Sequence, residues 1–198
     1  MSNRFYQGMW TVFAPIIRLR HRVEVQGIEN LPTDEAVLIC ANHSHALDPA
    51  LLGAVMPKTT KLRIMAKKQL FRIPLLAKLI TKLGAFPVDR GNSDIAAIKN
   101  SIRSLRDGWH LVVFPEGTRV EKPGEVRAKG GIAMIAIRSG VKLLPVYLDS
   151  NRKLFHKTKV VFGKPYEPVY TGRRGTAEEY QANADEIMRQ IYELGGMM

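Results

Sequence analysis

Two side chains in the stretch 41–49 have the chemistry of a general base and the group that orients it. His43 and Asp48 stand five positions apart in Ala-Asn-His-Ser-His-Ala-Leu-Asp-Pro. An imidazole changes charge near neutral pH, and a carboxylate bonded to one ring nitrogen leaves the other nitrogen free to take a proton. The pair can therefore activate a hydroxyl group that the substrate itself supplies.

Other interpretations of this stretch have less support. Ser44 is a poor candidate nucleophile, because the Gly-x-Ser-x-Gly pattern is absent and a serine beside its own base is badly placed for activation. His43, His45 and Asp48 resemble a run of metal ligands, but the spacing and the few remaining histidines disfavour a metal site. We also expect Asp48 to cap a helix beginning at Pro49, with one oxygen capping and the other accepting from the imidazole.

Polar clusters follow three apolar runs that we interpret as strands. The run 36–40, which contains the buried Cys40, precedes the His/Asp pair, and 84–88 and 110–114 precede clusters at 89–91 and 115–119. Ligands bind at the carboxyl ends of strands in open α/β sheets. Arginines, exposed N–H groups and a threonine hydroxyl in the two later clusters are typical of a phosphate site, to which Lys129 can add charge.

The hydrophobic pattern alternates between strands and helices along the chain. With 198 residues, 45% of them hydrophobic, the chain can bury one core. The pattern predicts an α/β fold with a mixed, mostly parallel sheet flanked by helices. We expect strands at 22–26, 36–40, 62–66, 84–90, 110–114 and 142–148, with an edge strand at 160–163. We expect helices at 3–20, 49–56, 67–82 with a break near Pro74, 94–106, 130–140, and 176–194 with a capping box of Thr176 and Glu179.

The net charge of +12 comes from two segments. Residues 1–23 hold four arginines and residues 49–88 hold eight basic residues, and neither segment contains an acid. This predicts a polyanionic partner, whether a membrane, a nucleic acid or an acidic protein. The apolar part of helix 3–20 is too short to cross a bilayer and lacks a signal-peptide cleavage site. Its aromatics and terminal arginines favour a helix lying in the membrane interface over one packed on the core, and 67–82 has a similar composition.

Four blocks in this order resemble those of the glycerolipid acyltransferases, specifically the 1-acyl-glycerol-3-phosphate (lysophosphatidate) acyltransferases. The resemblance runs from about Gly27 to Val146, and Val120 departs from it where a small polar residue is common. The blocks are Asn42-His43-x-x-x-x-Asp48, Gly84-Ala85-Phe86-Pro87-Val88-Asp89-Arg90, Phe114-Pro115-Glu116-Gly117-Thr118-Arg119 and Leu143-Leu144-Pro145-Val146.

The resemblance implies transfer of an acyl chain from coenzyme A or acyl carrier protein to the sn-2 hydroxyl of lysophosphatidate, giving phosphatidate in phospholipid biosynthesis. It needs no cofactor or metal. It implies His43 as general base, oriented by Asp48, while Pro145 helps to line the site. The residues implied to bind the glycerol phosphate are Arg90, Glu116, Gly117, Thr118 and Arg119.

We accordingly divide the chain into a membrane-interface helix, 1–22, and an acyltransferase domain, 23–198, and expect a peripheral protein on the cytoplasmic face of the cell membrane. The acyl donor, the acyl-chain length and the acceptor head group stay open, so another lysophospholipid acceptor is an alternative. A basic nucleic-acid-binding module is a second alternative. It is disfavoured because the basic segment 49–88 offers only Phe71 and Phe86 for base stacking.

Overall fold

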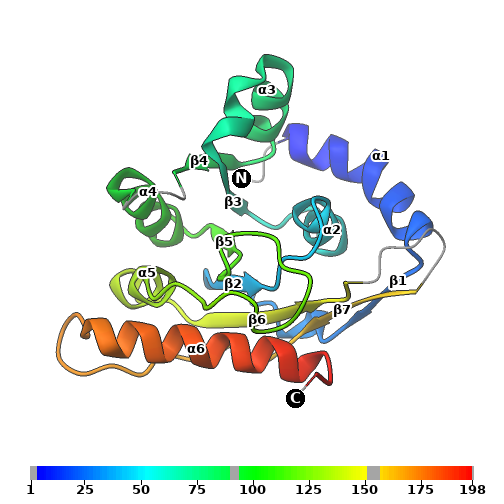
Figure 1. Cartoon of the computed structure of the whole chain (residues 1–198). Helices are drawn as coiled ribbons and strands as arrows, with labels where there is room; N and C mark the ends of the chain where they lie inside the picture. Colours follow the sequence, from blue (N-terminus) through cyan, green and yellow to red (C-terminus); the bar gives the residue numbers. More distant parts are fainter. Residues whose placement is uncertain (1–3, 90–93, 151–156, 198) are drawn as a thin grey trace.

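A seven-stranded sheet runs through the molecule in the order β1-β7-β6-β2-β5-β3-β4 (Figure 1). The computed structural model describes residues 4–89, 94–150 and 157–197. The strands are β1 (Val23–Gln26), β2 (Leu38–Ala41), β3 (Leu62–Lys67), β4 (Ala85–Val88), β5 (His110–Val113), β6 (Leu143–Leu148) and β7 (Thr158–Phe162).

The sheet is parallel except at one pair of strands. β2 pairs in parallel with β5 and β6, β3 does so with β5 and β4, and β1 does so with β7, whereas β6 and β7 are antiparallel. The expected mixed, mostly parallel sheet is confirmed. The expected edge position of 160–163 is wrong, because β7 has β1 on one side and β6 on the other and buries Val160 and Phe162.

Helices cover both faces of this sheet, so the α/β class is confirmed. α4 (Ile95–Arg106), α5 (Gly131–Ser139) and α6 (Ala177–Leu194) lie on one face, and α1 (Arg4–Arg20) and α2 (Asp48–Val55) lie on the other (Figure 1). The remaining helices are α3 (Pro74–Lys82) and the short 3-10 helices η1 (Ile28–Asn30) and η2 (Lys68–Arg72). The break before Pro74 and the capping box of Thr176 and Glu179 are both confirmed.

β2 can hold the loop that follows it in a fixed place because the strand is buried on both faces. Leu38 and Cys40 pack with α4, α5 and α6, while Ile39 and Ala41 pack with α2, and all four side chains are fully buried. A continuous apolar run is what a central parallel strand requires. The strand therefore delivers residues 42–48 to the carboxyl edge of the sheet at a fixed place.

The N-terminal helix α1 is attached to the end of α2 by four side-chain hydrogen bonds. Backbone carbonyls in the last turn of a helix have no partner within that helix, and here side chains of α1 supply the donors. The bonds are Tyr6 Oη to Gly53 O (3.1 Å), Trp10 Nε1 to Met56 O (2.9 Å), Arg18 Nε to Ala54 O (2.9 Å) and Arg18 Nη2 to Val55 O (3.1 Å).

α1 thus packs on the fold by one side and leaves an apolar side exposed. The exposed side chains are Val12, Phe13, Ile16 and Leu19. The sequence left two interpretations of this helix, one packed on the core and one lying in the membrane interface. In the structure one side of α1 packs on the core and the other side is an exposed apolar surface. Within the described residues, no helix combines the length and the hydropathy needed to cross a bilayer.

Candidate active site

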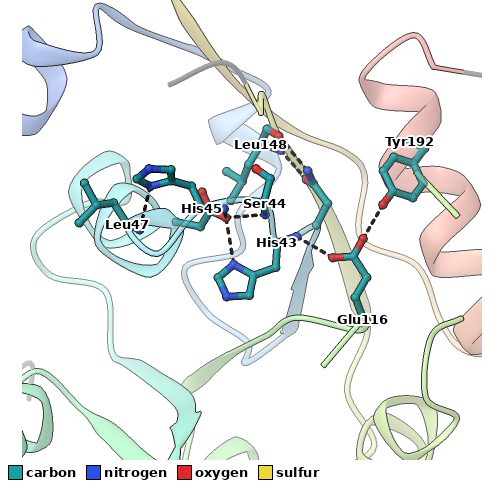
Figure 2. Close-up of polar contacts among 9 residues, drawn as sticks. His43, Ser44, His45, Leu47, Glu116, Leu148 and Tyr192 are labelled. Atoms are coloured by element: carbon teal, nitrogen blue, oxygen red, sulfur yellow. Dashed lines mark hydrogen bonds and ion pairs between the residues drawn. The ribbon is translucent and has the colours of Figure 1, made fainter. Parts of the chain in front are cut away.

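His43 and Asp48 form a buried hydrogen-bonded pair at the end of β2. His43 Nδ1 lies 2.9 Å from Asp48 Oδ2, and the same oxygen accepts the main-chain N–H groups of Ser44 (2.9 Å) and His45 (2.8 Å) (Figure 2). Asp48 has no exposed surface and His43 is 7% exposed. Because the carboxylate accepts at Nδ1, Nε2 is the nitrogen left to take a proton from a substrate.

The expected capping role of Asp48 is wrong by one residue. Leu47 is the N-cap of α2, and Asp48 is its first residue. Its carboxylate turns back to the loop, where Oδ2 accepts from the His43 ring and from the N–H groups of Ser44 and His45. We had expected one oxygen to cap the helix and the other to accept from the imidazole. A negative charge at the start of a helix is still stabilised by the helix dipole.

The main chain of His43 is held by the loop that follows β5. The His43 N–H donates to Glu116 Oε2 (2.8 Å), and the Val120 N–H donates to the carbonyl of His43 (2.9 Å). The imidazole also stacks on Phe114, with the ring centres 4.2 Å apart. The candidate base and the loop 114–120 therefore form one unit.

Asn42 fixes the same loop from the other neighbouring strand. Its Nδ2 donates to the carbonyl of Leu148 (2.8 Å), and the Leu148 N–H donates to its Oδ1 (2.7 Å). This exchange of two bonds continues the pairing of β2 with β6 by one further residue. The loop bearing His43 is thus anchored from both sides.

Glu116 is buried behind His43 and is bonded to α6. Its Oε1 accepts the hydroxyl of Tyr192, and it is 2% exposed. Burial raises the pKa of Glu116, and the hydrogen bonds from Tyr192 and from the His43 N–H oppose part of that rise. Glu116 is absent from the described cavity wall, so its carboxylate faces protein donors.

A cavity of about 570 Å³ adjoins the His/Asp pair. Its wall is mostly apolar and comes from α1, α2, β3 and α3 together with the loops after β2 and β5. The polar and charged side chains on it include His43, Lys67, Thr118 and Arg119. Ligand pockets typically have this size and this mixture of an apolar lining with a few polar groups.

The sequence-predicted site residues are only partly brought together. Thr118 and Arg119 share the cavity wall with His43. Gly117 sits in a left-handed turn (φ 67°), and a Cβ there would lie 3.5 Å from Cε of Lys129, so the exposed Lys129 side chain runs alongside this loop. Pro145 is buried in the middle of β6 against Gly163 and does not reach the described cavity wall.

The cluster after β4 lies farther away. Two strands, β5 and β3, separate β4 from β2. The two ends are therefore about 14 Å apart at the usual spacing between strands. Asp89 donates its N–H to Asp94 Oδ2 (2.9 Å), which ties this turn to the start of α4. Arg90, the residue expected to act here, lies outside the described residues.

Two residues of the site were missed by the sequence analysis. Tyr192 is one position of an amphipathic helix, and nothing in its own neighbourhood distinguishes it from core packing. Lys67 at the end of β3 was counted among the basic residues, although its place after a predicted strand was a usable signal. Among the described residues, no group of three or more His, Cys, Asp or Glu is arranged to hold a metal ion.

Comparison with known proteins agrees with this geometry. The acyltransferase family model matches residues 22–149, a range that includes both loops of the site. The chain belongs to the acyltransferase family, as the four sequence blocks predicted.

The most similar relatives include two bacterial enzymes and one crystal structure. A 1-acyl-sn-glycerol-3-phosphate acyltransferase of Bacillus subtilis is 32% identical over 185 residues, covering 90% of this chain and 91% of that protein. One from Borreliella burgdorferi is 34% identical over 140 residues, covering 69% of this chain and 54% of that protein. The crystal structure of the 1-acyl-sn-glycerophosphate (LPA) acyltransferase PlsC from Thermotoga maritima matches with a TM-score of 0.70 and 25% identity, covering 97% of this chain and 79% of that one.

Proposed function

We propose that the protein transfers an acyl group from a thioester, carried by coenzyme A or acyl carrier protein, to the sn-2 hydroxyl of lysophosphatidate, giving phosphatidate. The observation that carries this proposal is a buried His/Asp pair whose histidine lies on the wall of an apolar cavity that also bears cationic side chains. Family membership and the names of the relatives support it.

In the proposed reaction His43 is the general base and Asp48 orients it. Nε2 of His43 takes the proton of the acceptor hydroxyl as its oxygen attacks the thioester carbonyl carbon. A C–O bond forms, the C–S bond breaks, and the proton passes from the imidazolium to the leaving thiolate. Asp48 keeps the proton on Nδ1 beforehand and stabilises the imidazolium in between, because its oxygen already faces that nitrogen.

The acceptor phosphate is proposed to bind at the cationic part of the cavity wall. Arg119 offers a guanidinium fork, Thr118 a hydroxyl and Lys67 an ammonium group, and all three line the cavity that His43 also lines. Arg90 and Lys129 stay proposals for additional charge. We propose that Glu116, Gly117 and Pro145 support the shape of the site, since they lie outside the described wall.

The acyl chain is proposed to occupy the apolar part of the cavity. Met9 and Phe13 of α1, Ala50 and Gly53 of α2, and Ile80 of α3 line it. Burying a methylene group stabilises a bound chain by about 0.8 kcal/mol, so an apolar wall is suited to this substrate. The depth of this wall would then set the acyl-chain length that the sequence left open.

We further propose that the protein works peripherally on an anionic membrane, at the cytoplasmic face of the cell membrane. Apolar side chains are exposed on α1 and on the segment of η2 and α3, and both segments also line the cavity. The exposed residues of the second segment are Leu70, Ile73 and Leu75. Lipid contact at these segments would present the acceptor next to the cavity.

The test is an assay with purified protein, both thioester types and a panel of lysolipids. His43→Ala should abolish transfer and leave binding to anionic vesicles intact, because α1 and α3 are untouched. His45→Ala is the comparison, since it removes a nearby imidazole but keeps the main-chain N–H to Asp48, and it should retain most of the activity. Turnover by His43→Ala close to that of the wild type would refute the proposal.

A further inference from the structure

Resting on the proposed acyl transfer, we infer that Tyr192 of α6 is a positioning residue for the reaction, because its hydroxyl holds the Glu116 carboxylate that in turn holds the main-chain N–H of His43. Neither Tyr192 nor α6 belongs to the sequence blocks that carry the family resemblance. Tyr192 also lies outside the region matched by the family model, which ends at residue 149.

The three groups form a continuous chain of hydrogen bonds. Figure 2 shows the carboxylate of Glu116 between Tyr192 and the main chain of His43, with one oxygen directed to each. Tyr192 is 5% exposed, Glu116 2% and His43 7%, so water does not readily replace either bond. A buried carboxylate needs such donors, since an unsatisfied one is strongly unfavourable.

Each link in the chain limits the movement of the next. Glu116 has several rotatable bonds, and donors at both oxygens select one orientation of its carboxylate. Tyrosine suits this role because a rigid ring carries its hydroxyl on only two side-chain torsions.

The end of α6 is itself fixed. The N–H groups of Gly195 and Met197 both donate to the carbonyl of Tyr192 (each 3.1 Å). A Cβ on Gly195 would come within 2.5 Å of the Tyr147 ring, so the chain closes over β6 at this glycine. The hydroxyl of Tyr192 is therefore presented by a well-packed segment.

Loss of the hydroxyl should affect turnover more than substrate binding. The residues that we propose to hold the substrate, Thr118 and Arg119, line the cavity, whereas Glu116 and Tyr192 are absent from its described wall. A misplacement of a catalytic group by about 1 Å can lower a rate about a hundredfold. The expected signature is a lower kcat with an unchanged KM.

The first test compares Tyr192→Phe with Tyr166→Phe. Tyr166 packs against the same core, and its buried hydroxyl has no hydrogen-bond partner among the residues that the structure describes, so removing it is a matched control. We expect kcat of Tyr192→Phe to fall about tenfold or more with both KM values within about twofold of wild type. Tyr166→Phe should match the wild type. An unchanged kcat in folded Tyr192→Phe, or a rise in KM alone, would overturn the inference.

The second test asks whether the hydroxyl acts through Glu116. In a Glu116→Ala background, Tyr192→Phe should cause no further loss of kcat, whereas equal losses in both backgrounds would contradict the chain of bonds. Glu116→Gln should retain at least about tenfold more kcat than Glu116→Ala. Its amide oxygen can accept from His43 while its N–H₂ group donates to the Tyr192 oxygen. Equal kcat values in these two Glu116 variants would break the chain of bonds at Glu116 and overturn the inference even if Tyr192→Phe is too unstable to assay.

The outcomes separate this inference from the proposed function. If the wild-type protein transfers no acyl group from either thioester to any lysolipid, the proposed function fails. If the wild type transfers and the Tyr192 and Glu116 variants behave independently, only the positioning role fails. Thermal unfolding of each variant shows whether a lower kcat comes from fewer folded molecules, which a purely structural role for the hydroxyl would produce.

Discussion

A single glycine in the cavity wall allows the acyl-chain site to be tested by length. Gly53 lies inside α2, it lines the cavity, and a Cβ built on it meets no atom within 4 Å. The hydrogen bond from Tyr6 uses its backbone carbonyl, which any substitution keeps. Gly53→Leu therefore adds four carbons to space that we assign to the acyl chain.

The expected loss of kcat/KM follows from the apolar surface that the acyl chain can no longer bury. Each displaced methylene forfeits about 0.8 kcal/mol, so Gly53→Leu should weaken transition-state binding of a chain that fills the cavity by about 3 kcal/mol, or about 200-fold in kcat/KM. Gly53→Ala displaces about one methylene and should lower it about fourfold. For acyl chains short enough to end before Gly53, both variants should have the same kcat/KM as the wild type.

The assay measures kcat/KM for a series of saturated acyl thioesters of increasing length at a fixed lysophosphatidate concentration. The preferred length should shorten slightly in Gly53→Ala and by several methylenes in Gly53→Leu. Thermal stability should not fall, because glycine inside a helix is less favourable than alanine by about 1 kcal/mol. An unaltered length profile in a folded Gly53→Leu protein would refute the assignment of the cavity to the acyl chain, and so would an equal loss at every length.

Three further outcomes are expected. Arg119→Ala should raise the KM for lysophosphatidate about tenfold or more, through loss of a charged contact to phosphate, and should raise the KM for the thioester much less; equal effects would contradict a phosphate role. Arg18→Ala should lower the free energy of unfolding in urea by about 1.5–3 kcal/mol, because two bonds to the end of α2 are lost, while Arg20→Ala on the same helix should change it little. Burial raises the pKa of Glu116 in the folded protein above its ordinary value of 4.5, which it keeps in the unfolded chain. The wild-type protein therefore loses free energy of unfolding as the pH rises from about 4.5 through the raised pKa. The stability of Glu116→Gln relative to wild type should accordingly increase as the pH rises above about 4.5, and a difference independent of pH in chemical unfolding would argue against this.

Local patterns in the sequence were sufficient to predict most of the fold. The apolar run before Asn42 and the spacing of Ile95, Ile98 and Ile102 each report on one element, and the structure places a strand and a helix there. The position of β7 could not be obtained in this way. It depends on antiparallel pairing with β6 and parallel pairing with β1, and neither pairing leaves a mark within residues 158–162.

The candidate site was predictable where its groups are close in sequence. His43 and Asp48 are five residues apart, so their pairing followed from the loop itself, and the structure brings them together. The contact of Glu116 with Tyr192 joins positions 76 residues apart. The cavity likewise required knowing that α1 lies beside α2 and α3, because none of these helices encloses a space alone.

The placement of α1 couples ligand binding to the integrity of the N-terminal segment. This helix both supplies part of the cavity wall and satisfies the last carbonyls of α2, the helix whose first residue is Asp48. Thermodynamic linkage is reciprocal. An acyl chain bound in the cavity must therefore stabilise the packing of α1 by the same free energy by which packed α1 strengthens binding of the acyl chain. Association with a membrane surface that loosened the packing of α1 would correspondingly promote release of the acyl chain from the cavity.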